Sequence, residues 1–135
     1  MNKILIAHTS WYKEYIDQMV KESSDILTKA NFSTNLTCAP GAIELPALAK
    51  NKILKDKYSG VLFLGIVIRG ETSHYELVTN EAFRSIGNLS MDFNDISFIN
   101  NVLCVENESQ LKERIQKNTE NNTKALIDLI YEKSS

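Results

Sequence analysis

The chain has 135 residues, a length typical of one domain, and we expect residues 1–135 to form a single domain. Its hydrophobic fraction of 43% and charged fraction of 24% are ordinary for a globular protein and exclude an intrinsically disordered chain. The formal net charge of -2 leaves no basic excess to neutralise a phosphate backbone. Nucleic acid is therefore not expected as a partner.

Strand-like and helix-like segments alternate along the first half of the chain. Residues 3–7 form a short apolar run typical of a buried strand, and Ser10 is placed to cap a helix that reaches residue 30. Residues 32–39 predict a second strand, which Pro40-Gly41 ends. The next helix is expected over residues 44–54.

The second half repeats the alternation. Residues 60–68 are apolar at nearly every position, which is typical of a strand covered on both faces. A helix then ends at about Gly87, a glycine suited to a C-cap. Residues 96–105 predict a fourth strand, and two helices are expected over 107–117 and 124–133, separated by a polar stretch at 120–123.

This order of elements predicts parallel strands joined by right-handed crossovers. We therefore expect an α/β protein, a three-layer α/β/α sandwich with a four-stranded parallel flavodoxin-like sheet. Ligands in such sheets bind beyond the carboxyl ends of the strands. That rule directs attention to residues 9–12, 39–44, 68–74 and 100–104.

Several classes of site and location are disfavoured. Neither a GxGxxG nor a GxxxxGK[ST] loop is present, so the usual nucleotide-binding cradles are missing. Cys38 and Cys104 form no CxxC pair and are expected as reduced core thiols, and His8 and His74 lack the spacing of a zinc site. We expect no metal and no cofactor. With no signal peptide and no run of ~18 apolar residues, the expectation is a cytoplasmic protein without a membrane partner.

The stretch from Ile68 to His74 is the most informative one. Gly70 permits a sharp turn out of a buried strand, and Glu71, Thr72 and Ser73 then lie near a helix N-terminus that suits a phosphate group. His74 can project into the same crevice, where an imidazole donates and accepts protons near neutral pH. The alternative is that Thr72 and Ser73 only cap the helix and His74 is a surface residue.

Three further residues have two readings each. Trp11, the sole tryptophan, can stack on a flat heterocycle or cover the end of the sheet. Glu44 can hold a ligand hydroxyl or cap a helix. Arg114 can clamp a phosphate or remain a solvated charge.

Taken in order, residues 40–46 (PGAIELP), 64–75 (LGIVIRGETSHY) and 80–82 (NEA) resemble the lumazine synthase family. The likeness runs from about residue 3 to near the C-terminus. The family makes 6,7-dimethyl-8-ribityllumazine, the penultimate step to riboflavin. The resemblance implies a cofactor-free condensation of 5-amino-6-ribitylamino-pyrimidinedione with 3,4-dihydroxy-2-butanone 4-phosphate, which releases phosphate and water.

The resemblance also implies roles for individual residues. His74 matches the proton-transfer histidine, Trp11 the stacking ring, and Arg114 the phosphate-binding arginine. The segment that holds the ribityl chain matches Ala42, Ile43 and Glu44. The phosphate-binding turn matches Gly70, Glu71 and Thr72. The remaining substrate contacts match Val67, Ile68 and Asn100.

The implied assembly is a homopentamer with its sites at subunit interfaces. Trp11, Glu44 and His74 would come from one subunit and Arg114 from its neighbour. Because the chain begins directly at the strand before Trp11, we expect a free pentamer and not a sixty-subunit shell.

Four positions depart from the family pattern. Ile43 replaces a common aromatic, Tyr12 a frequent asparagine, and Asn100 a strand-end aromatic, while Glu120-Asn121-Asn122-Thr123 replaces Gly-Asn-Lys-Gly. These departures keep two alternatives open: a non-catalytic flavin- or lumazine-binding protein, and a related riboflavin synthase that consumes lumazine. The presence of both Arg114 and His74 favours an active enzyme.

Overall fold

The computed structural model describes residues 2–71 and 74–135 of the chain. Strands and helices alternate along it, with two short 3-10 turns (η1 and η2) on the connections. The elements in order are β1 (Lys3–His8), α1 (Lys13–Lys29), β2 (Ser33–Cys38), η1 (Ala42–Glu44), α2 (Leu45–Ile53), β3 (Gly60–Ile68), η2 (Arg69–Glu71), α3 (Tyr75–Asp92), β4 (Ser97–Val105) and α4 (Glu108–Ser134).

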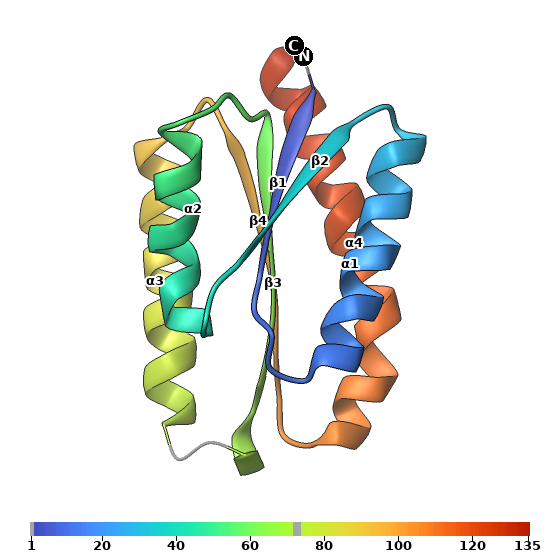
Figure 1. Ribbon diagram of the computed structural model, residues 1–135, viewed down its shortest axis with the longest axis vertical. Coiled ribbons are helices and arrows are strands. Elements are labelled where there is room, and N and C mark those ends of the chain that lie inside the picture. The colour runs from blue at the N-terminus through green and yellow to red at the C-terminus, as the bar shows by residue number, and fades with distance from the viewer. Residues whose placement is uncertain (1, 72–73) are drawn as a thin grey trace.

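The four strands form one parallel sheet in the order β2-β1-β3-β4. Helices α1 and α4 cover one face of this sheet, and α2 and α3 cover the other (Figure 1). Both chain ends lie at the amino end of the sheet, at the top of Figure 1. The predicted three-layer α/β/α sandwich with a four-stranded parallel, flavodoxin-like sheet is confirmed.

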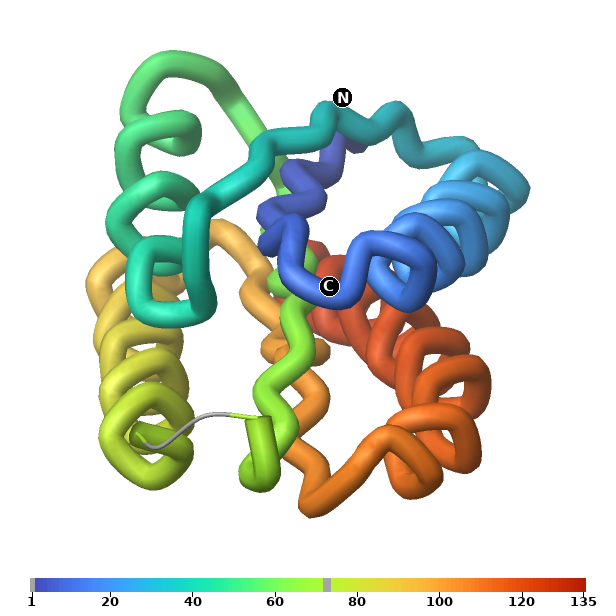
Figure 2. Tube along the Cα trace, turned by 60° about the horizontal axis from the view of Figure 1, so that its bottom comes forward, coloured from blue at the N-terminus to red at the C-terminus, as the bar shows by residue number. Residues whose placement is uncertain are grey.

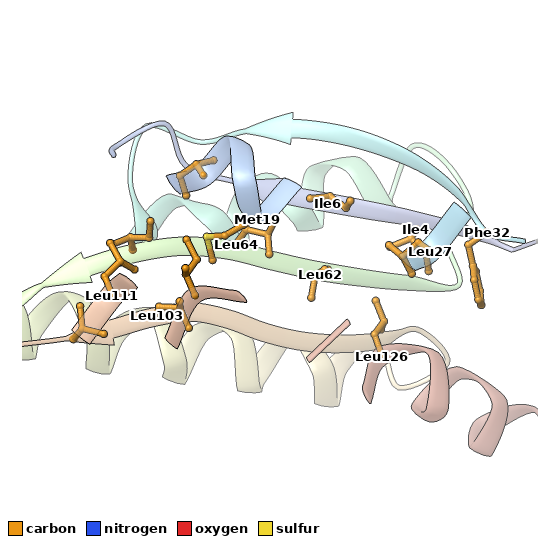
Figure 3. Close-up of a cluster of buried hydrophobic side chains, with 14 of the residues drawn as sticks. Ile4, Ile6, Met19, Leu27, Phe32, Leu62, Leu64, Leu103, Leu111 and Leu126 are labelled. Atoms are coloured by element: carbon orange, nitrogen blue, oxygen red, sulfur yellow. The ribbon is translucent and has the colours of Figure 1, made fainter. Parts of the chain in front are cut away.

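The central strand β3 is buried at all nine positions, as its unbroken apolar run predicts. Alternate side chains of a strand point to opposite faces, so β3 supplies two separate cores. Leu62 and Leu64 pack with Ile4 and Ile6 beneath α1 and α4 (Figure 3). Phe63, on the other face, packs with the side chains beneath α2 and α3. Two buried faces fix the register of the sheet and therefore the position of the loops at its carboxyl end.

Two predicted helix boundaries are wrong. Helix α3 continues through Gly87 to Asp92, because a glycine inside a helix is tolerated and nothing in the structure requires the chain to turn there. At the other boundary, Tyr12 and not Ser10 is the N-cap of α1. Tyr12 adopts the left-handed conformation, with φ 60° and ψ 54°, which sets the direction in which α1 leaves the sheet.

Helix α4 is continuous where the sequence pattern predicted two helices. Thr119 and Thr123 occupy buried positions on its inner face, and the buried Asn101 of β4 donates to Thr119 Oγ1 at 3.0 Å. Asn122 Nδ2 donates to Asn101 Oδ1 at 2.6 Å, and Thr123 Oγ1 donates to the Thr119 carbonyl. The polar stretch therefore continues the inner face of the helix with hydrogen-bonded groups in place of apolar ones.

Both thiols are free, and the prediction of a core position is wrong for Cys38 alone, since Cys104 packs against the core beneath α2 and α3. Cys38 is exposed because β2 is an edge strand with no fully buried position. Cys104 is half-buried, and this burial raises the pKa of its thiol to about 11. Within the described part of the chain, no helix has the length and apolar character needed to cross a membrane.

Candidate functional site

A cavity of about 490 Å³ lies at the carboxyl end of the sheet, where three connecting segments meet. Figure 2 turns this end of the molecule toward the reader. The walls come from the turn after β1, the turn after β2, and the end of β3 with the segments that follow it. The lining residues are Thr9, Trp11, Tyr12, Gly41, Ala42, Ile43, Glu44, Ile66, Val67, Ile68, Glu71 and Val78.

The turn after β1 contributes an exposed aromatic wall. Trp11 is 68% exposed, so it does not pack in the core, and its indole Nε1 donates to the Pro40 carbonyl at 3.1 Å. This bond ties the first turn to the second and orients the ring. The hydroxyl of the neighbouring Thr9 is buried and has no hydrogen-bond partner among the described residues.

The turn after β2 places a carboxylate and two backbone N–H groups on the wall. A Cβ at Gly41 would lie only 2.7 Å from Glu44 Oε1, so a larger residue there would displace the end of the Glu44 side chain. Ala42 and Ile43 start the short η1 turn, where the first N–H groups of a helix have no partner within it. The Glu44 side chain makes no capping bond to α2, so its carboxylate is not used to cap the start of that helix.

The end of β3 supplies the third wall through Val67, Ile68 and Glu71. Gly70 follows the strand but does not have a positive φ, so the prediction that its backbone freedom makes the turn is wrong. A Cβ there would make ordinary contact, 3.9 Å from the Glu106 carbonyl. Gly70 is exposed and lies outside the cavity lining, and Thr72 and Ser73 lie outside the described residues.

Arg69 stabilises the turn that follows β3, and the sequence alone did not predict this role. Its Nε donates to the Glu106 carboxylate at 3.0 Å, Nη1 pairs with Glu76, and the guanidinium lies 4.2 Å from the centre of the Tyr75 ring. The carboxylates of Glu76 and Glu106 raise the pKa of Arg69. One side chain thus joins the ends of β3 and β4 to the start of α3.

His74 occupies the N-cap position of α3, with its carbonyl accepting the Val78 N–H at 2.9 Å. It is exposed and is not itself part of the cavity wall. Residues four apart lie on the same side of a helix, and Val78 does line the cavity. His74 therefore lies one turn before Val78 on the same side of α3, outside the residues that line the cavity.

Asn100 and Arg114 are not brought to the cavity within one chain. Asn100 lies in the middle of β4, not at a strand end, and its Oδ1 accepts the Val102 backbone N–H at 2.8 Å. Arg114 is exposed on α4, on the face of the sheet opposite α2 and α3. A neighbouring molecule would be needed to bring either residue to the site.

Most of the residues that line the cavity are apolar, and the charged ones are acidic. Among the described residues that line it, Glu44 and Glu71 are charged and none is basic. Nor does the described part of the chain hold any group of three or more His, Cys, Asp or Glu side chains placed to bind a metal ion. The lining residues without a predicted substrate contact are Thr9, Tyr12, Gly41, Ile66 and Val78. The first four lie within two residues of predicted ones, and helical spacing from His74 is the signal for Val78.

Comparison with known proteins places this chain in a family. Residues 1–132 match the family model described as 6,7-dimethyl-8-ribityllumazine synthase. A protein of that description from Bartonella tribocorum is 36% identical over 119 residues, which cover 87% of this chain and 78% of the relative. One from Neisseria gonorrhoeae is 35% identical over 129 residues, covering 93% and 81%, and one from Novosphingobium aromaticivorans is 36% identical over 110 residues, covering 82% and 78%. The chain belongs to the 6,7-dimethyl-8-ribityllumazine synthase family.

Proposed function

We propose that this chain condenses 5-amino-6-ribitylamino-pyrimidinedione with 3,4-dihydroxy-2-butanone 4-phosphate to give 6,7-dimethyl-8-ribityllumazine, a reaction of riboflavin biosynthesis. Family membership supports this proposal. The observation that carries it is the cavity, whose walls combine an exposed indole, a carboxylate with adjacent N–H groups, and the turn that leads to His74. The same proposal assigns the enzyme to the cytoplasm.

The reaction needs two substrates held together and protons moved between them. The aromatic amine attacks the ketone and loses water to form an imine, after which phosphate is eliminated. The ribityl-bearing nitrogen then attacks the remaining carbonyl and a second water leaves. Alignment of two substrates contributes up to about 7–11 kcal/mol in ideal cases, and a positioned acid or base contributes ~10²–10⁴-fold.

Each wall of the cavity has a part in this proposal. Trp11 stacks on the pyrimidine ring, while Glu44 and the N–H groups of Ala42 and Ile43 hold ribityl hydroxyls. The Gly70–Glu71–Thr72 turn takes the phosphate group. His74 moves the proton that must leave carbon as phosphate departs.

A phosphate also needs a cation, and no described residue of the cavity wall supplies one. Arg114 is an exposed cation on α4, outside the cavity lining, so we propose that it reaches the site of a neighbouring copy in a homopentamer. Exposed apolar side chains on α3, including Leu77 and Met91, fit a subunit contact. Five chains of 15.3 kDa give about 77 kDa, and a megadalton particle in light scattering would contradict a free pentamer.

Mixing the protein with both substrates and following lumazine fluorescence tests the reaction. Formation of lumazine supports the proposal, whereas tight binding without turnover would indicate a lumazine- or flavin-binding protein. A second arm supplies lumazine alone. Riboflavin formed in that arm would show a riboflavin synthase instead.

A further inference from the structure

Tyr12 holds a backbone conformation that its side chain disfavours. Its φ of 60° places it in the left-handed region, where a Cβ crowds the following carbonyl and where glycine or asparagine is better tolerated. The other described residue of this kind is Asn31, which has the short polar side chain that suits the region. Backbone strain of this kind collects at functional sites, where surrounding structure maintains it.

The strained backbone places the Tyr12 ring on the cavity wall. Tyr12 packs against the core beneath α1 and α4 and also lines the cavity, together with Ile68 and Glu71. The hydroxyl makes no hydrogen bond to any described residue, which distinguishes it from Tyr15, one turn further along α1. Tyr15 donates its hydroxyl to Glu108 at 2.5 Å.

Two features keep the Tyr12 hydroxyl a donor. Partial burial raises its pKa, and the Glu71 and Glu108 carboxylates raise it further, so the phenol remains protonated at neutral pH. A protonated phenol donates to an acceptor oxygen, and Trp11, the preceding residue, offers the ring on which a flat ligand with such oxygens stacks.

We propose that Tyr12 is a specificity-determining residue whose hydroxyl donates a hydrogen bond to an oxygen of the pyrimidinedione substrate stacked on Trp11. The identity of that substrate rests on the proposed function. The strained turn is retained because it directs the phenol into the cavity. A less strained residue would stabilise the turn and weaken the site.

Three variants separate binding from folding. Tyr12→Phe removes only the hydroxyl, Tyr12→Asn relieves the strain as well, and Tyr15→Phe makes the same chemical change outside the cavity. Trp11 is the only tryptophan, so its fluorescence reports binding of the pyrimidinedione without turnover. Steady-state KM values for each substrate are measured in parallel.

We expect Tyr12→Phe to weaken pyrimidinedione binding about 3- to 10-fold, the loss of one neutral hydrogen bond, with the KM for the butanone phosphate unchanged. Tyr12→Asn should bind at least as weakly, because it also lacks the phenol hydroxyl. Tyr15→Phe should bind like the wild type.

Wild-type affinity in Tyr12→Phe, or a rise confined to the KM for the butanone phosphate, would overturn the inference. These results differ from those that bear on the proposed function, which fails if the wild type forms no lumazine. The fluorescence titration reports on Tyr12 in either case.

Discussion

The two ends of the parallel sheet are built from the same strands but are finished differently. At the amino end, Lys3 pairs with Asp56 and lies 4.9 Å from the centre of the Tyr58 ring, whose hydroxyl accepts a bond from Asn35. A smaller hollow of about 380 Å³ is present there, but its Lys133 already donates to the Ile96 carbonyl at 2.9 Å. The polar groups of this end are largely engaged within the chain.

The carboxyl end leaves comparable groups available. Trp11 is mostly exposed, the Thr9 hydroxyl is buried without a partner in the described structure, and the Glu44 carboxylate does not cap its helix. The left-handed residues differ in the same way, with Asn31 at the amino end and Tyr12 at the carboxyl end. This difference indicates that the amino end of the sheet serves folding, whereas the carboxyl end keeps a strained residue and unpaired polar groups for a ligand.

Replacing His74 with alanine should have the largest effect at the carboxyl end. We expect kcat to fall by ~10²–10⁴-fold, because a positioned acid or base contributes that much, while residual turnover continues from substrate alignment. Steady-state kinetics and a thermal melt measure the two effects separately. Since His74 is exposed, the melting temperature should change little. Turnover equal to that of the wild type would remove His74 from the mechanism.

Arg114→Ala tests whether the carboxyl end is completed by a neighbouring subunit. Loss of a charge-assisted bond to phosphate costs about 1.5–3 kcal/mol, so the KM for the butanone phosphate should rise roughly 10- to 100-fold. Lys112→Ala removes another exposed cation from the same helix and serves as the control. An unchanged KM in Arg114→Ala, or an equal rise in Lys112→Ala, would contradict the assigned role.

Gly60→Val addresses the amino end, where stability and not chemistry should respond. A Cβ on Gly60 would lie 3.0 Å from the terminal methyl groups of Leu126 and Ile130 and 3.1 Å from that of Ile4. Overpacking of this kind costs about 1–3 kcal/mol of unfolding free energy, which urea denaturation measures. The kinetic constants should stay at wild-type values. A KM shift as large as that of Arg114→Ala would break the distinction between the two ends.

The sequence predicted the sheet well because its signal is local. An unbroken apolar run such as residues 60–68 can only be a doubly covered strand in this pattern of elements, and it is. The same reasoning failed at α4, where Thr119 and Thr123 interrupt the apolar periodicity. Thr119 accepts a hydrogen bond from Asn101 of β4, and Thr123 donates one to the helix backbone. A partner such as Asn101, which lies on a strand and not on the helix, leaves no signal in the local sequence pattern.

The candidate site was predictable only in part, for a related reason. Trp11, Glu44 and Glu71 follow from the rule that ligands bind beyond the carboxyl ends of parallel strands, and all three line the cavity. Tyr12 lies in the segment 9–12 that the same rule indicates, but no substrate contact is predicted for it, because the direction of its side chain depends on a left-handed backbone angle that the sequence pattern does not reveal. The location of Arg114 depends on a second molecule, which no pattern within one chain can place.

Gly87→Ala should have the smallest effect and acts as the matched counterpart of Gly60→Val. Gly87 lies inside α3, and a Cβ added there meets no atom within 4 Å. Alanine is favoured over glycine in a helix interior by about 0.5–1 kcal/mol, mainly because it restricts the unfolded chain. Urea denaturation should therefore show a gain of that size, with kcat and both KM values unchanged. A loss of stability would mean that another molecule packs closely against this surface of α3, and light scattering on the variant would then show a smaller particle than the wild type.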